Sequence, residues 1–177
     1  MLLTREKKCQ VLVLCTGNSA RSIMVEALLN SDGKAFFHAF SAGSHPTGRV
    51  NPFALEQISQ LNSEGPWHSK SWEQFATADA PEIDLVLTVC GEAEKESCPT
   101  FSGSANHLSW AVPDPAAVIG SDSEKRRAFS ACFDQFQQRI ALVTQTLGAT
   151  KASVSECIEV MDFAANKTSE NSYDICV

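Results

Sequence analysis

A cysteine is followed six positions later by an arginine in the segment CTGNSARS, and this pair has the chemistry to bind and attack an oxyanion. The thiolate of Cys15 would be the nucleophile, and the positive field of a surrounding loop would lower the pKa of its thiol. The planar guanidinium of Arg21 can hold two oxyanion oxygens at once, which a lysine cannot do. We therefore predict an oxyanion-binding loop that consists of Thr16, Gly17, Asn18, Ser19, Ala20, Arg21 and Ser22.

Such a loop must lie between a strand and a helix, so that its N–H groups and the helix N-terminus point into one concavity. The apolar run VLVL predicts a strand over Gln10–Leu14, and apolar residues at helical spacing predict a helix over Ser22–Asn30. Gly17 supplies backbone freedom, and the Asn18 side chain can pin the loop. The alternative is a buried cysteine at a strand end beside an unrelated arginine.

The rest of the chain alternates strand and helix patterns, which is typical of a three-layer α/β domain. Helix starts are expected at Asn51, which would cap a helix with Pro52 in its first turn, and at Ser121. We expect a domain over residues 8–147, and a tail over 148–177 with at most one short helix near Val154–Ala165. The further predicted elements are strands over Ala35–Ser41, Ile83–Val89 and Ala105–Trp110, and a long helix over Ser121–Leu147.

Composition narrows the classes of function. A length of 177 residues suits one domain. The sequence contains no run of 18 apolar residues, so no membrane-spanning helix is predicted. The net charge of −7 argues against a nucleic-acid partner. Seven cysteines without an export signal indicate a cytosolic protein with buried, catalytic or redox-active thiols. The four histidines show no metal-ligand spacing, so no metal is expected.

The anion loop resembles the signature of the low-molecular-weight tyrosine phosphatase family, and above all that of its arsenate reductase branch. The resemblance covers about residues 8–147 and implies that family's fold, a four-stranded parallel sheet flanked by helices. Besides VLCTGNSARS, the segments that carry it are FSAGSHPTGRVNPFALEQI, GPWHSKSWEQF, DLVLTVCGEAEKESCPTF and HLSWAVPDPAAV.

The resemblance makes Cys90 the second and Cys98 the third thiol of a disulfide relay that reduces arsenate to arsenite, with phosphate as a competitor for the site. Cys90 ends a predicted strand, at the sheet edge where the anion loop also lies. Eight residues of intact helix span about 12 Å, whereas a disulfide needs Cα atoms within about 7 Å. Any helix within Gly91–Ser97 must therefore unwind before Cys90 and Cys98 can pair.

No bound cofactor is implied, but an external thiol reductant is needed to restore the thiols. The thioredoxin-coupled branch of the family has six residues between its last two relay cysteines, and this chain has seven. The resemblance makes thioredoxin the first choice of donor, and because the spacing differs a glutathione–glutaredoxin system is kept as the second.

Three further positions match supporting sites of the family. Asp114, in a Pro-Asp-Pro loop, matches the general acid that protonates a leaving oxygen, although Asp before Pro is also common in turns. Glu26 and Ser41, with the loop asparagine, match potassium ligands. An acidic ligand expected near Ser71 is absent, and Lys70 could place its ammonium where the ion would lie, so we expect no potassium.

Two other functions stay open. The first is hydrolysis of phosphate monoesters through a phosphocysteine, with Cys90 and Cys98 as bystanders. Ala116 and Ala20 argue against phosphotyrosine as the substrate, because phosphotyrosine phosphatases of this family carry an aromatic residue and a second loop cysteine there. The second is a redox-regulated module that binds an oxyanion without turnover.

Overall fold

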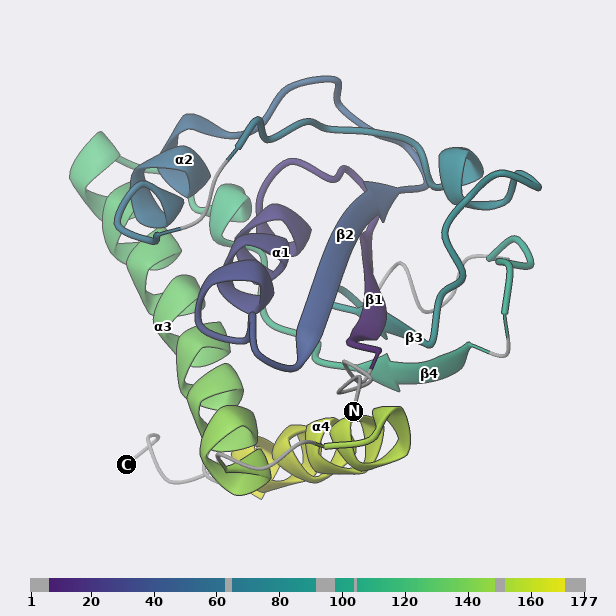
Figure 1. Cartoon of the computed structure of the whole chain (residues 1–177). Coiled ribbons are helices and arrows are strands. Elements are labelled where there is room, and N and C mark those ends of the chain that lie inside the picture. Colours follow the sequence, from purple (N-terminus) through teal and green to yellow (C-terminus); the bar gives the residue numbers. More distant parts are fainter. Residues whose placement is uncertain (1–6, 63–64, 92–97, 104, 149–151, 171–177) are drawn as a thin grey trace.

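Four parallel strands form one sheet in the order β2-β1-β3-β4 (Figure 1). The computed structural model describes residues 7–62, 65–91, 98–103, 105–148 and 152–170. The α/β class and the four-stranded parallel sheet are confirmed. The strands are β1 (Cys9–Cys15), β2 (Phe37–Gly43), β3 (Leu85–Thr88) and β4 (Asn106–Ser109), each within two residues of its predicted bounds.

The helices begin where side chains can cap them. Asn51 accepts a hydrogen bond from the backbone N–H of Phe53, and Ser121 forms a reciprocal capping box with Glu124, so both predicted helix starts are confirmed. The helices are α1 (Arg21–Ser31), α2 (Pro52–Ile58), α3 (Asp122–Leu147) and α4 (Val154–Glu170), with two short 3-10 helices, η1 (Trp72–Phe75) and η2 (Pro115–Ala117).

Successive side chains of β1 point to opposite faces of the sheet, and nearly all of them are buried, so β1 is covered on both faces. Val11 and Val13 belong to the larger core cluster, to which α1, α2, α3 and α4 contribute their buried residues. Leu12 and Leu14 belong to a smaller cluster that includes Phe75 of η1. The α-helices therefore pack into one apolar cluster, and the other face of β1 is covered by η1 and by connecting segments (Figure 1).

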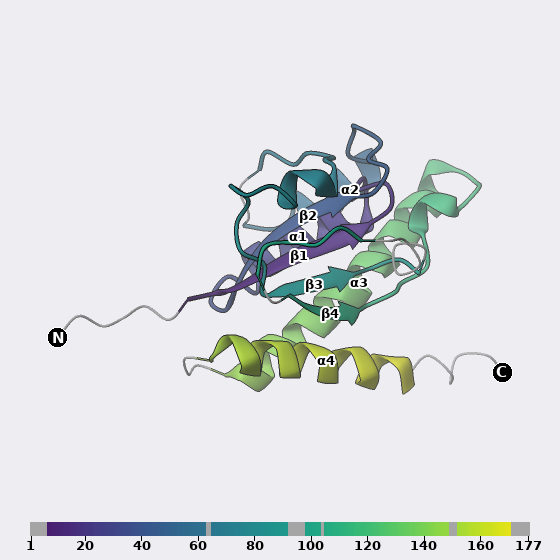
Figure 2. The same cartoon turned by 90° about the vertical axis from the view of Figure 1, so that its right-hand side faces the viewer.

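Helix α4 is longer than the short helix expected in the tail, and it packs against α3 and β4 (Figure 2). Its buried residues Cys157, Met161 and Ala164 join the larger core cluster. The indole N–H of Trp110 donates to the backbone oxygen of Met161 at 3.2 Å, which fixes α4 beside the end of β4. The sequence pattern predicts too short a helix here, because two of the three buried positions among the side chains that the structure describes in α4 are a cysteine and an alanine, which add little to a hydrophobic pattern. Among the described helices, none combines the length and apolarity needed to cross a membrane.

We expect Met161→Ala to lower the free energy of unfolding by about 2–5 kcal/mol, because it leaves a cavity between α4 and the sheet. Phe163→Ala is the matched control on the same helix, since the Phe163 side chain is exposed and should change stability by only about 0.5 kcal/mol. Urea unfolding measures both. Equal losses in the two variants would contradict the packing of α4 on the core.

Candidate active site

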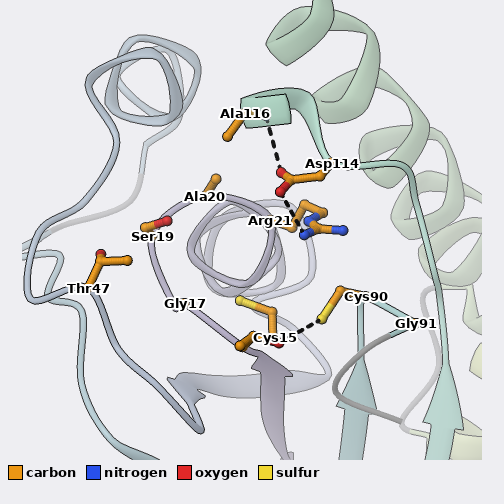
Figure 3. A pocket seen from close by; sticks show the side chains of 11 residues that line it. Cys15, Gly17, Ser19, Ala20, Arg21, Thr47, Cys90, Gly91, Asp114 and Ala116 are labelled. Carbon is orange, nitrogen blue, oxygen red and sulfur yellow. Dashed lines mark hydrogen bonds and ion pairs between the residues drawn. The ribbon is translucent and has the colours of Figure 1, made fainter. Parts of the chain in front are cut away.

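The segment between β1 and α1 wraps around a pocket of about 590 Å³ (Figure 3). Of the predicted catalytic residues, Cys15, Arg21, Cys90 and Asp114 all line it, whereas Cys98 does not. They come from the end of β1, the start of α1, the residues after β3 and the loop before η2. The other lining residues are Thr16, Gly17, Ser19, Ala20, Thr47, Gly91 and Ala116.

The loop is held in shape by the fully buried side chain of Asn18. Its amide nitrogen donates to the hydroxyls of Ser22 and Ser41 at 3.0 and 2.9 Å, and its amide oxygen accepts the backbone N–H of Lys70 at 2.8 Å. Asn18 has a φ of 42°, in the left-handed region that asparagine tolerates better than most residues. These bonds orient the loop without using the pocket-lining side chains.

Cys15 is buried at the base of the pocket, with hydrogen-bond donors around its sulfur. The sulfur lies 2.9 Å from the Ser22 hydroxyl and accepts the backbone N–H of Asn18 at 3.2 Å. Burial raises the pKa of the Cys15 thiol, and the hydrogen bonds from Ser22 and Asn18 oppose that rise. The net direction is opposite to the lowered pKa expected from the sequence, because desolvation of the thiolate, together with the neighbouring Cys90, outweighs the hydrogen bonds from Ser22 and Asn18.

Arg21 links the anion loop to the loop that carries Asp114. Its Nη1 donates to the backbone oxygen of Val112 at 3.0 Å, and its Nη2 lies 3.3 Å from Oδ2 of Asp114. The other carboxylate oxygen of Asp114 accepts the backbone N–H of Ala116 at 3.1 Å and caps η2. Asp114 therefore has both features weighed from the sequence, since it caps a turn and also reaches the pocket.

The two outer cysteines lie in different surroundings. Cys90 is buried, faces the pocket and has its sulfur 3.9 Å from Oγ1 of Thr16 (Figure 3). Cys98 is half-buried against the smaller core cluster, to which Leu12 and Leu14 contribute from the other face of β1. The structure therefore does not bring Cys98 to the pocket. Residues 92–97, where any helix would have to unwind for Cys90 and Cys98 to pair, lie outside the described residues, and none of the six described cysteines is in a disulfide.

Glu26, Ser41 and Lys70 lie close together behind the loop. The Ser41 hydroxyl donates to the Glu26 carboxylate, and the Lys70 ammonium lies 3.7 Å from the same carboxylate oxygen. Burial raises the pKa of Glu26, while Lys70 and Ser41 oppose the rise. Within the described ranges, no group of three or more His, Cys, Asp or Glu side chains is placed to hold a metal ion.

Sequence reasoning missed two neighbours of the loop. Thr47 lines the pocket from the connection after β2, and its only signal is the run of turn residues that surrounds it. A side chain at Gly43 would collide with the backbone oxygen of Thr16, so this glycine allows β2 to end against the loop. Neither contact leaves a periodic pattern in the sequence.

Known proteins resemble this chain over most of its length. The profile of the family described as low molecular weight phosphotyrosine protein phosphatase matches residues 10–153. Several relatives are named arsenate reductase. That of Halalkalibacterium halodurans is 33% identical over 138 residues, covering 75% of this chain and 93% of the relative. That of Bacillus licheniformis is 30% identical over 143 residues, covering 78% and 97%.

Solved structures show the same fold. A low molecular weight protein tyrosine phosphatase from T. tengcongensis has a TM-score of 0.58 at 21% identity, covering 76% of this chain and 96% of its own. A thioredoxin-dependent arsenate reductase from Corynebacterium glutamicum has a TM-score of 0.50 at 25% identity, covering 77% and 64%. With the profile match spanning β1 to the segment before α4, the chain belongs to the low molecular weight phosphotyrosine protein phosphatase family, whose members are enzymes.

Proposed function

We propose that this enzyme reduces arsenate to arsenite, with phosphate as a competitor for the same loop. The observation that carries the proposal is the presence of two thiols, those of Cys15 and Cys90, with Arg21 in one anion pocket. Hydrolysis needs a single thiol, whereas reduction of arsenic(V) to arsenic(III) needs a second one to take part in a disulfide. The name of the relatives supports the same reaction.

The first step forms a bond between sulfur and arsenic. The oxyanion lies against the loop N–H groups and the Arg21 guanidinium, and the Cys15 thiolate attacks arsenic. An arsenic–oxygen bond breaks, and Asp114 donates the proton with which that oxygen leaves as water. The position of Asp114 in the pocket wall supports this role. The bound oxyanion must first take over the Arg21 contact of Asp114, because that ion pair favours the ionised carboxylate, which has no proton to donate.

The second step transfers two electrons. The Cys90 thiolate attacks the Cys15 sulfur, the sulfur–arsenic bond breaks, and its electron pair stays on arsenic, which leaves as arsenite. The product on the protein is a Cys15–Cys90 disulfide. Both sulfurs border the pocket, which supports direct attack.

The third step moves the disulfide to Cys98. The Cys98 thiolate attacks Cys90, a Cys90–Cys98 disulfide forms, and Cys15 is released as a thiolate for the next cycle. Because Cys98 packs against the smaller core cluster, it must leave that position to reach Cys90. Among the described residues, a Cβ added at Gly91 would meet no atom within 4 Å, so the residue after Cys90 is not closely packed.

An external dithiol must then reduce Cys90–Cys98. We propose a thioredoxin-type donor, in line with the thioredoxin dependence of the Corynebacterium glutamicum neighbour, and a glutathione–glutaredoxin system as the second choice. Such a cycle requires a compartment that keeps thiols reduced, so we place the enzyme in the cytosol.

Hydrolysis of phosphate monoesters is the second candidate. Cys15, Arg21 and Asp114 supply a nucleophile, an oxyanion clamp and an acid, which are the groups that this reaction needs. The described pocket wall contains no aromatic residue, and Ala116 lines it where an aromatic would pack on a phenol, so phosphotyrosine is a poor match. A binding module without turnover would require none of the cysteines beyond Cys15.

Cys90→Ser should abolish arsenate reduction supported by thioredoxin, because no second thiol remains to release arsenite, while weak hydrolysis of an aryl phosphate survives. Cys157→Ser is the matched control, since this buried thiol lies in α4, outside the lining of the pocket, and both activities should persist. Coupled NADPH oxidation measures the first activity and nitrophenol release the second. Arsenate reduction in Cys90→Ser would exclude the relay, and no turnover in the unmodified protein with donors supplied would favour the binding module.

Ser22→Ala should raise the pKa of the Cys15 thiol further, because the thiolate loses the hydroxyl donor and keeps only the backbone N–H groups of Asn18 and Ser22. The thiolate fraction at neutral pH then falls, and alkylation by iodoacetamide should slow by about tenfold, with the rate profile displaced to higher pH. Ser31→Ala, at the other end of α1, is the control and should leave the rate unchanged. Mass spectrometry of the Cys15 peptide follows the reaction. A profile displaced to lower pH would show that Ser22 does not stabilise the thiolate.

We also propose that Lys70 takes the place of a potassium ion behind the loop, because its ammonium lies beside Glu26. The thermal unfolding midpoint should then be the same in KCl and NaCl at equal ionic strength, since a specifically bound ion would add stability in proportion to the logarithm of its concentration. Lys70→Met should be less stable in both salts because Glu26 loses its cation. A higher midpoint in KCl for the unmodified protein would contradict the proposal.

A further inference from the structure

A second pocket, of about 370 Å³, opens beside the anion pocket, and Ser19 and Thr47 line both. The two pockets therefore meet at the rim of the loop. Arsenate and phosphate have only a few atoms and occupy the loop alone, so neither fills the second pocket. The remaining residues that line the second pocket are Arg49, Val50, Asn51 and Pro52.

The wall of the second pocket is tied to the anion loop by backbone hydrogen bonds. The N–H of Thr47 donates to the oxygen of Gly17 at 3.0 Å, and the N–H of Asn51 donates to the oxygen of Ser19 at 2.8 Å. The Thr47 hydroxyl closes the turn by donating to the backbone oxygen of Arg49 at 2.9 Å. The backbone of Arg49 is thus held at a fixed place relative to the loop.

Arg49 differs from the other cations around the pocket. Arg21 lies beside Asp114, Lys70 beside Glu26, and Arg126 on α3 beside a glutamate of α2. Arg49 is exposed, and across the described part of the chain it has no carboxylate partner within ion-pair distance. In a chain of net charge −7, a cation without a carboxylate at the edge of an anion site is well placed to bind one from a ligand.

We propose that the second pocket is a subsite for the carboxylate of a larger ligand, whose oxyanion head lies in the Cys15 loop. The chemical class is a small phosphate monoester with a carboxylate on its alcohol part. The carboxylate binds the Arg49 guanidinium, and the carbon chain crosses the rim formed by Ser19 and Thr47. The inference rests on the oxyanion-binding role proposed for the loop and is independent of arsenate reduction.

Phosphonocarboxylates test this subsite without turnover, because their carbon–phosphorus bond resists hydrolysis. Calorimetric titration compares a series from phosphonoacetate to 6-phosphonohexanoate with alkylphosphonates of equal chain length. At one or more lengths the carboxylate should tighten binding by about twofold to fivefold, because the pair that it forms with the exposed Arg49 is open to solvent. Arg49→Gln should remove that gain, and Arg49→Lys should restore part of it. Arg127→Gln, an exposed arginine of α3 that lines neither pocket, should keep the whole gain.

Inorganic phosphate is the internal reference in the same titrations, and its affinity should be equal in the unmodified protein and the Arg49 variants. If phosphate binds but the carboxylate does not increase affinity at any chain length, the subsite is excluded, while the proposal that the loop binds oxyanions is retained. The subsite is also excluded if Arg127→Gln loses as much affinity as Arg49→Gln, since a general charge effect then explains the gain. If phosphate itself does not bind the unmodified protein, both the loop proposal and the subsite fail.

Discussion

The side-chain amide of Asn18 is the constraint on which the site depends. It is fully buried, and it makes three hydrogen bonds that connect the anion loop to α1, to β2 and to the segment before η1. A buried amide that lacks hydrogen-bond partners costs free energy of folding. The need to keep these three hydrogen bonds therefore holds the loop and its three partners in place together. Ser41 also donates to Glu26, which extends the network to the Lys70 ammonium. The loop therefore keeps its shape through groups behind it, and the pocket side is left for a ligand.

Much of the fold and part of the site follow from local sequence patterns. The buried run of β1, the caps at Asn51 and Ser121 and the spacing of Cys15 and Arg21 are signals that do not depend on distant residues. The meeting of Cys90 with the loop also follows, because parallel strands present their carboxyl ends at one sheet edge.

Other features depend on tertiary contacts that leave no local pattern. The pKa of Cys15 is raised because burial outweighs the nearby donors, and the degree of burial is set by the whole pocket wall. Cys98 lies against the smaller core cluster because of the path that the chain takes after β3, which spacing alone does not give. The length of α4 depends on its packing against α3 and on its hydrogen bond with Trp110, since its buried residues are small or weakly apolar.

The ion pair between Arg21 and Asp114 has a consequence for selectivity among the anions of a cell. The guanidinium already pairs with a carboxylate and donates to a backbone carbonyl, so a visiting anion must take over these contacts. Chloride, with a single charge on a single acceptor atom, gains little from that replacement. A tetrahedral dianion accepts several hydrogen bonds at once and recovers more than it displaces. The Arg21–Asp114 ion pair thus lowers the affinity of the site for abundant, weakly binding anions more than for a tetrahedral dianion.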